Sequence, residues 1–424
     1  MKRALLGTTA VLGAGLVGLG WAVAPARADG PIQLTVGGFF REAYMVVLDD
    51  DEEGNNFGVG REPGFDHNTD GFFNDAEVHF TGRTVLDNGL EVGARIELEG
   101  ENDDDQIDEA WVYFAGGFGE VRIGSDDDAL ENSCIVPPGG TANFSAFSPN
   151  QWGANAFNVV SPFGGFPSPF GAVTNSACTG VDNKGDAQKI VYFSPIFYGF
   201  QLTASYTPDP SAEDHVDGVG PHVGMPAKSV SEFEGDASFD AAFYLTYFYA
   251  GSDWDITLGG GGSFEHDNED IEGAFTDVHH EEQDFYQAAF VLNIDRFSIG
   301  GVFEYYNDLA NTEFENAFSD TRFKQDAWVA GGGVAYNYNA WTFGAQYSYR
   351  KDIFKETESP FNFEKTQVQQ RAVATVNYAL GPGINLDGEF GYTWRDQDPE
   401  NLSPVFNNDD YSAMEFGVGT AITF

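Results

Sequence analysis

The sequence predicts an all-β fold, a transmembrane antiparallel β-barrel of about sixteen strands with one long loop folded inward. Three observations carry this prediction. Segments of roughly ten residues alternate between apolar and polar positions, and short turns alternate with long acidic connections along the chain. The chain also ends on an aromatic residue, Phe424, at the end of a full-length alternating segment. Beyond residue 28 no apolar run is long enough for a membrane helix, so strands would have to cross the bilayer.

Residues 1–28 are predicted to be a secretory signal peptide. Lys2 and Arg3 precede an apolar stretch from Ala4 to Val23, and Ala26-Arg27-Ala28 is a small-x-small cleavage site. Removing this segment takes the formal charge from −47 to −50, and the mature chain, a single barrel over 29–424, begins near Asp29. An uncleaved membrane anchor is the alternative.

The alternation is clearest at the C-terminal end. Met414, Phe416 and Val418 lie on one face of the predicted strand, and Glu415 and Gly417 lie on the other. The same rhythm predicts strands at 32–47, 72–85, 90–99, 107–114, 120–124, 187–194, 200–207, 237–250, 254–265, 283–293, 296–307, 325–338, 341–351, 365–379, 383–396 and 410–424.

The connections indicate how these strands would sit in a membrane. Turns such as Asp87-Asn88-Gly89 are short, and the segments 49–70, 208–236, 266–282, 308–324, 352–364 and 397–409 are long and acidic. Both termini then lie at the short-turn end. A soluble sandwich would turn its apolar face inward, whereas here we expect that face to meet lipid. Aromatic girdles are expected at Tyr338, Trp341, Tyr349, Tyr392 and Trp394.

The stretch from Asp126 to Asp186 has almost no alternation and is rich in Pro, Gly, Ser, Asn and Phe. A loop of this length is uncommon and usually functional, so we expect it to fold into the barrel lumen. It contains both cysteines of the chain, Cys134 and Cys178, which in an exported protein are expected to form a disulfide. Two free thiols are the alternative.

Composition and motifs exclude several functions. With 67 acidic and 20 basic residues, the chain has no basic surface for nucleic acid. No hydrolase, metalloprotease or nucleotide-binding motif is present, so no enzyme is predicted, and His79 is the only starting point for a hydrolase site on the barrel. No cofactor or metal is expected. Asp49–Gly54 lacks the closing Glu of a calcium loop, since Gly60 stands there, and His279–Glu282 is interpreted as a solvated loop. Loosely bound Ca²⁺ among acidic loops is the remaining hypothesis.

Several sequence blocks resemble the Gram-negative general porins of alphaproteobacterial type. These blocks are Gly89–Glu99, Gln106–Tyr113, Gly117–Gly124, Lys189–Pro195, Gly199–Leu202 and the terminal Phe424. The resemblance implies a homotrimer of sixteen-stranded barrels in the outer membrane, in contact with lipid and lipopolysaccharide. It also implies that the loop at 126–186 constricts each pore and that Phe424 marks the chain for barrel assembly.

Family porins place basic wall residues opposite acidic groups on the constriction loop. The candidates for the basic wall are Arg41, Arg83, Arg95 and Arg122. The candidates for the acidic loop are Asp126, Asp127, Asp128, Glu131, Asp182 and Asp186. Two alternatives remain: Asp126 to Asp128 as a solvated loop mouth, and Arg83 and Arg95 as partners of nearby glutamates.

The predicted function is a channel for passive diffusion of small hydrophilic solutes and ions. The excess of acidic over basic groups predicts a preference for cations. One alternative is a substrate-specific porin, for instance for sugars, because Trp111 and Tyr113 are predicted to face the lumen. Another alternative is a non-conducting acidic surface or adhesive barrel.

Overall fold

The structure is a computed structural model of the 424-residue chain. It describes residues 32–49, 70–100, 107–147, 187–208, 239–266, 270–272, 276–280, 283–316, 319–357, 363–397 and 411–424. The signal peptide predicted at 1–28 and the calcium-loop-like segment after Asp49 lie outside these residues. Within the described part of the chain, no helix is long and apolar enough to span a bilayer.

The described chain is built from strands joined in sequence order. The first nine are β1 (Gln33–Asp49), β2 (Asp70–Val85), β3 (Glu91–Glu99), β4 (Ile107–Gly116), β5 (Gly119–Ser125), β6 (Gln188–Phe193), β7 (Phe200–Thr207), β8 (Phe239–Ala250) and β9 (Trp254–His266). The others are β10 (Asp270–Glu272), β11 (Thr276–His280), β12 (Gln283–Ile294), β13 (Phe297–Asn316), β14 (Ser319–Tyr338), β15 (Trp341–Thr357), β16 (Phe363–Gly381), β17 (Ile384–Gln397) and β18 (Tyr411–Thr423).

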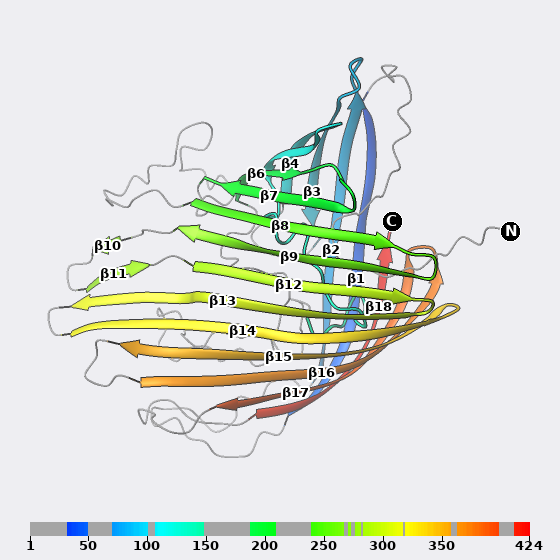
Figure 1. Ribbon diagram of the computed structural model, residues 1–424. Coiled ribbons are helices and arrows are strands. Elements are labelled where there is room, and N and C mark those ends of the chain that lie inside the picture. The colour runs from blue at the N-terminus through cyan, green and yellow to red at the C-terminus, as the bar shows by residue number, and fades with distance from the viewer. Residues whose placement is uncertain are drawn as a thin grey trace.

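Sixteen of these strands, β1 to β9 and β12 to β18, close into one antiparallel barrel (Figure 1). Each wall strand pairs with the next in sequence, β9 pairs with β12, and β18 pairs with β1 from Phe39↔Thr423 to Asp49↔Ala413. Closure satisfies the backbone hydrogen bonds of both edge strands, which a bilayer requires. The predicted fold class is therefore confirmed.

Most predicted strands begin and end within about two residues of the observed ones. The prediction of a long loop at 308–324 was wrong, because β13 and β14 continue as a paired hairpin through that segment. A register shift between Tyr306 and Ala310 lies where the two strands extend. The segment 266–282 was also predicted to be a loop. It contains two short strands, since β10 pairs with β11 and β11 pairs with β13.

The outer face of the barrel is apolar, as the alternation predicts for strands in contact with lipid. Phe243, Phe290, Phe303, Phe343 and Phe416 are each at least 41 % exposed and point outward from five different strands. Two aromatic pairs show the packing of rings on neighbouring strands. Trp341 lies against Tyr378 at the short-turn end, with 4.5 Å between ring centroids, and Trp328 lies against Tyr349 midway along β14 and β15, at 4.8 Å.

The two ends of the described chain meet at the short-turn end of the barrel. The amide of Gly38 donates to the carbonyl of Phe424 at 3.1 Å, and the amide of Phe424 donates back to Gly38 at 3.1 Å. Gly38 has φ of 148°, and a Cβ there would overlap the carbonyl of Glu77. The two hydrogen bonds therefore join Phe424 to β1, and the positive φ and the close approach of Glu77 require glycine at position 38.

The segment from Asp126 to Phe147, here called the inner loop, follows β5 and lies against inward-facing side chains of the wall. Its Leu130, Ile135 and Phe147 form the main apolar cluster with wall residues such as Phe285 and Val329. The core of this barrel therefore lies between the inner loop and one side of the wall. Burying each large apolar side chain contributes about 1.5–3 kcal/mol to holding the loop there.

Candidate functional site: the lumen wall and the inner loop

The inner loop starts with contacts to β6 and β7, the two strands that follow it in the sequence. Lys189 of β6 donates to the carbonyl of Asp126. The amide of Ala129 donates to Ser205 Oγ of β7 at 2.9 Å, and the hydroxyls of Ser133 and Thr203 are 2.6 Å apart. These bonds satisfy buried polar groups at the base of the loop and direct the chain along the wall.

The middle of the inner loop approaches the wall so closely that the wall must carry glycine. A Cβ at Gly333 of β14 would overlap the carbonyl of Pro138, and one at Gly344 of β15 would overlap the carbonyl of Gly139. Thr375 of β16 donates its hydroxyl to the same Gly139 carbonyl at 2.6 Å. The absence of side chains at these wall positions makes a track in which the loop backbone lies.

One wall side chain holds two separate parts of the inner loop. Gln346 of β15, 4 % exposed, accepts from Ser145 Oγ at 2.9 Å and from the amide of Ala146 at 2.8 Å. Its amide nitrogen donates to the carbonyl of Pro137 at 2.8 Å. A single carboxamide thus makes hydrogen bonds to both arms of the inner loop, at Pro137 and at Ser145 and Ala146.

The inner loop reaches the wall near the barrel seam as well. Asn143 donates to Asp387 of β17 at 2.8 Å. Phe144 packs with Ala43 and Met45 of β1 and with the partly buried Phe73 of β2. The described loop therefore follows the wall from β6 round to β1, and the wall of β1 to β5 beside the lumen carries most of the charged side chains discussed next.

Charged pairs line the wall of β1 to β3. Arg41 lies 3.0 Å from Asp75, and its guanidinium also covers the ring of Phe39 at 4.1 Å. Nearer the short-turn end, Arg83 is 3.9 Å from Glu91 and 54 % exposed. Both arginines point inward as predicted, and among the described residues both have acidic partners on the wall rather than on the inner loop.

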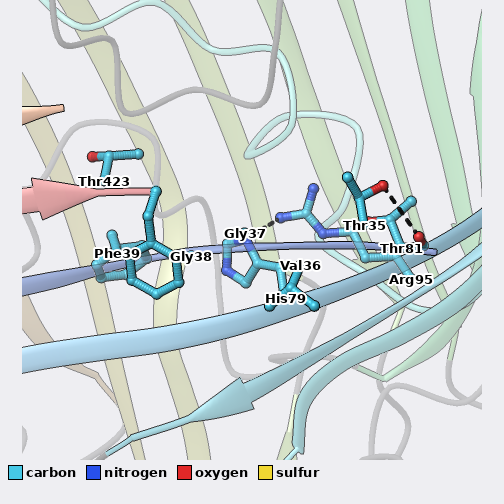
Figure 2. Close-up of a pocket in the computed structure, with 10 residues that line it drawn as sticks. Thr35, Val36, Gly37, Gly38, Phe39, His79, Thr81, Arg95 and Thr423 are labelled. Carbon is cyan, nitrogen blue, oxygen red and sulfur yellow. Dashed lines mark hydrogen bonds between the residues drawn. The ribbon is translucent and has the colours of Figure 1, made fainter. Parts of the chain in front are cut away.

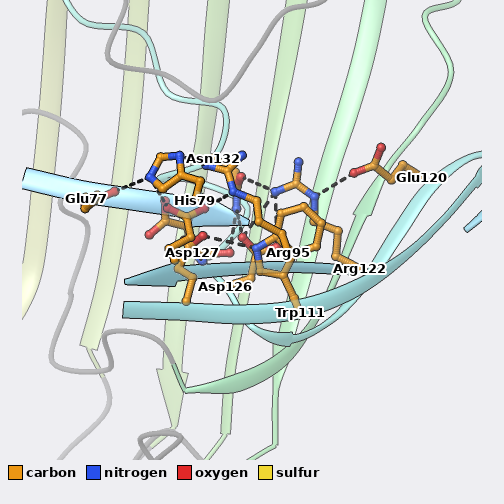
Figure 3. A network of polar contacts seen from close by, with 11 residues as sticks. Glu77, His79, Arg95, Trp111, Glu120, Arg122, Asp126, Asp127 and Asn132 are labelled. Carbon is orange, nitrogen blue, oxygen red and sulfur yellow. Dashed lines mark hydrogen bonds and ion pairs between the residues drawn. The ribbon is translucent and has the colours of Figure 1, made fainter. Parts of the chain in front are cut away.

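His79 lies at the centre of a polar network on β2 and β3 (Figure 3). Its Nε2 is 2.7 Å from Oε2 of Glu77 and 3.0 Å from Oε2 of Glu97. Nη2 of Arg95 lies 2.9 Å from Nδ1 of the same ring, and Nε of Arg95 pairs with Glu97. Because arginine is only a donor, Nδ1 accepts from it and Nε2–H donates to the carboxylates. The network continues to Glu109, which shares a hydrogen bond with Glu97.

Arg122 of β5 joins the wall to the inner loop. Its Nε donates to Glu120 at 2.7 Å, and its Nη1 reaches Asp126 at 3.3 Å and Asn132 Oδ1 at 3.1 Å (Figure 3). The guanidinium lies 4.3 Å over the ring of Trp111. This is the one predicted pair of basic wall and acidic loop that the described residues bring together.

Burial changes the titration of the acids at the loop base. Desolvation is the main cause that raises the pKa of Asp126, although Arg122 beside it opposes the shift. Desolvation, followed by the charge of Asp126, raises the pKa of Asp127 to about 7. The amide of Asp127 donates to Oε1 of Glu109 at 3.2 Å, which ties the loop base to β4.

The remaining candidates of the acidic loop differ in position. Asp128 accepts from the amides of Leu130 and Glu131 at 2.6 and 2.9 Å, which makes it a turn-forming residue. Glu131 is half-buried on the same turn. Asp182 and Asp186 lie outside the described residues.

The structure describes only one of the two cysteines of the predicted disulfide. Cys134 is disulfide-bonded, while Cys178, its predicted partner, lies outside the described residues. The bond anchors the inner loop at Cys134, beside the apolar cluster that Leu130 and Ile135 form with the wall.

Trp111 and Tyr113 face the lumen side as predicted, and each is 8 % exposed. Trp111 donates to Glu109 at 3.2 Å beneath Arg122, and the Tyr113 hydroxyl donates to Glu91 at 2.9 Å. Their ring faces are covered, so they do not form the open aromatic surface that a sugar-selective pore would need.

Glu77, Glu97, Glu109 and Gln346 are site residues that no sequence pattern identified. Period-two alternation along β2 and β3 turns Glu77 and Glu97 to the inward face, but whether they contact His79 depends on the strand register. That register follows from the hairpin at Asp87-Asn88-Gly89, which pairs Val85 with Glu91 and so His79 with Glu97. For Gln346 the sequence offers no comparable signal, because its partners lie about 200 residues away in an irregular loop.

A family model for Gram-negative porins matches residues 9–398 of this chain. The chain belongs to the Gram-negative porin family. Family and fold together place this porin in the outer membrane as a channel protein. Porins of this kind are typically non-enzymatic and generally need no cofactor.

Several solved structures match this porin over most of its length at low sequence identity. The trimer form of OmpT from Vibrio cholerae is 12 % identical with a TM-score of 0.48, over 92 % of this chain and 99 % of that one. The anion-selective porin from Comamonas acidovorans is 15 % identical with a TM-score of 0.48, over 92 % and 100 %. The channel DcaP of Acinetobacter baumannii is 12 % identical with a TM-score of 0.49, over 95 % and 100 %. A search of curated proteins finds no match.

Proposed function

We propose that this porin is a water-filled channel for passive diffusion of small hydrophilic solutes and ions, with a preference for cations. The observation that carries the proposal is the charge of the lumen wall beside the inner loop. Acidic side chains that alternation turns inward on β2 to β5 outnumber the arginines of β1 to β5. The acids are Asp75, Glu77, Glu91, Glu97, Glu99, Glu109 and Glu120, and the bases are Arg41, Arg83, Arg95 and Arg122.

Fixed charges in a narrow aqueous pore decide which ions enter, because screening there is weaker than in bulk solution. The neighbouring acids Glu77, Glu97 and Glu109 outnumber the one arginine between them, Arg95. Such a wall attracts cations and repels anions. The inner loop supports the proposal by occupying part of the lumen, so that solutes pass close to this wall.

We further propose that the porin works as a homotrimer with one pore in each subunit, in contact with outer-membrane lipid and lipopolysaccharide. The apolar outer face supports contact with lipid. The resemblance to general porins motivates the trimer.

Reconstitution into a planar bilayer under a salt gradient tests the proposal. A cation-preferring channel gives conductance steps, and the sign of its reversal potential shows that cations carry more of the current than anions do. A reversal potential of the opposite sign would contradict the preference for cations. A folded β-barrel that gives no steps would contradict the channel and favour a surface or adhesive role.

A further inference from the structure

Glu77, His79 and Glu97 form a compact group of potential metal ligands on the lumen wall. Glu77 and His79 are two residues apart on β2 and so share its inward face. Glu97 of β3 is the direct cross-strand partner of His79. One ligand atom from each of the three side chains lies within 4.8 Å of the other two.

The distances fit a metal ion with little movement. Nε2 of His79 is 2.7 Å from Glu77 Oε2 and 3.0 Å from Glu97 Oε2. Zinc is bound at about 2.0–2.2 Å by nitrogen and carboxylate ligands in tetrahedral geometry, which sets the ligand atoms roughly 3.3 Å apart. Nε2 of His79 therefore needs to move away from the Glu77 oxygen by about 0.6 Å and from the Glu97 oxygen by about 0.3 Å. The side chains of Glu77 and His79 are 19 % and 18 % exposed, so a fourth position stays open to water.

The charge around the group favours a cation. Glu109 shares a hydrogen bond with Glu97, which brings a third carboxyl group next to the same place. Arg95 is the one arginine in direct contact with His79 and Glu97 among the described residues. A hydrogen bond between two carboxyl groups needs a proton on one of them, so Glu97 and Glu109 together carry one negative charge and Glu77 carries a second. Arg95 offsets one of these two charges, whereas a dication would neutralise both.

The donor set indicates the class of ion. One imidazole nitrogen with two carboxylates suits zinc and the neighbouring divalent transition metals. Calcium prefers six to eight oxygen ligands, which this group does not supply. The Glu77–His79–Glu97 group also differs in place and in ligands from the acidic external loops considered for calcium.

In its observed position Arg95 prevents Glu77, His79 and Glu97 from binding a metal ion. Its guanidinium donates to Nδ1 of His79 and pairs with Glu97. An imidazole that binds metal through Nε2 carries its proton on Nδ1 and needs an acceptor there, so Arg95 must leave. It has room to do so, because its side chain is 32 % exposed. His79 and Arg95 also line an open cavity of about 420 Å³ (Figure 2).

We propose that Glu77, His79 and Glu97 bind one divalent transition-metal ion on the pore wall, in competition with Arg95. Metal then replaces a guanidinium as the cation of the network, and Arg95 swings into the lumen. Because Arg95 would then lie in the solute path, bound metal changes the current through the pore. Binding itself does not depend on the channel being cation-preferring or conducting.

Calorimetric titration of the refolded full-length barrel with Zn²⁺ tests the proposal directly. The wild type should bind one Zn²⁺ per chain at this site. His79→Gln should weaken that binding by more than about tenfold, and Arg95→Gln should tighten it by about tenfold because the competing cation is gone. The opposite signs of the two effects separate a metal site from general damage to the fold. His266→Gln, at the far end of β9 against Phe239, is the matched control and should titrate like the wild type.

Three results would overturn the proposal. The first is a wild type that takes up no Zn²⁺ in the titration. The second is binding that is equally tight in His79→Gln, which would place the metal elsewhere on the chain. The third is weaker binding in Arg95→Gln, which would make Arg95 a supporting residue instead of a competitor. Single-channel current at saturating Zn²⁺, compared between wild type and His79→Gln, then measures the effect on the pore.

Discussion

Gln346 on the wall and Ser145 on the inner loop are joined by a hydrogen bond of 2.9 Å, although 201 residues separate them in the chain. The same carboxamide also accepts from Ala146 and donates to Pro137. All of its hydrogen-bonding directions but one are thus used to hold the loop. This residue therefore ties the described part of the inner loop to the wall at both Pro137 and Ser145.

Replacing Gln346 by Leu should loosen the inner loop. The change leaves the Pro137 carbonyl and the Ala146 amide without their partner, which costs about 1–3 kcal/mol for each buried polar group left unpaired. We expect a lower thermal unfolding midpoint and a larger, noisier single-channel conductance. Gln370→Leu is the matched control, since Gln370 lies on the outer face and bonds to Tyr347. Equal conductance in Gln346→Leu and wild type would contradict the role given to Gln346.

Replacing Gly333 by Ala should displace the loop from its track. The new Cβ would meet the carbonyl of Pro138, which is backbone and cannot rotate away. We expect the variant to lose about 1–3 kcal/mol of stability, as overpacked sites do, and to conduct differently from the wild type. Gly381→Ala, where a new Cβ would have no other heavy atom within 4 Å, should change neither property. A Gly333→Ala protein with the stability and conductance of the wild type would show that the loop does not rest there.

Arg41 and Asp75 offer a reciprocal test of selectivity at one place on the wall. Asp75→Asn should lower the ratio of cation to anion permeability, because a negative charge is lost. Arg41→Gln should raise the ratio. Both variants break the same 3.0 Å ion pair, so any effect of losing the pair is common to them. Reversal potentials that move in the same direction in both variants would contradict control of selectivity by wall charge.

The pKa of Asp127, raised to about 7 mainly by desolvation, predicts a pH dependence of stability. The folded protein holds this proton more tightly than the unfolded chain, so the group's contribution to stability is greatest below pH about 4. It is lost as the pH rises through 7. Asp127→Asn, which carries no charge, should therefore raise the thermal unfolding midpoint at pH 8 by about 2 °C or more. The difference should shrink at pH 5. An equal difference at both pH values would contradict the raised pKa.

Much of the barrel could be predicted from the sequence because apolar and polar residues alternate along each wall strand and so distinguish its lipid-facing side from its lumen-facing side. Period-two alternation located strands such as β7, where predicted and observed bounds coincide at 200–207. Prediction failed at 308–324, since a polar, acidic segment can continue a hairpin beyond the bilayer where both faces are wet. The alternation also did not indicate that the apolar side chains of Phe285 and Val329 would lie on the inward face, because that placement depends on the inner loop covering them.

The site was less predictable than the fold for the same reason. Alternation placed Arg41, Arg95 and Arg122 inward, and the structure agrees. Their partners, however, are set by cross-strand register and by the course of the inner loop. Register is readable where a tight turn fixes it, as for His79 opposite Glu97. The course of an irregular segment rich in Pro and Gly is decided by distant contacts, such as Pro138 on Gly333, that no local pattern encodes.

Single-channel conductance of the refolded porin in a planar bilayer, with the reversal potential measured under a salt gradient, shows directly whether this barrel is a cation-preferring channel. We expect conductance steps grouped in threes and a reversal potential whose sign shows that cations carry most of the current. A folded barrel that gives no conductance would contradict the channel itself, and an anion-selective reversal potential would contradict the charge argument made for the wall.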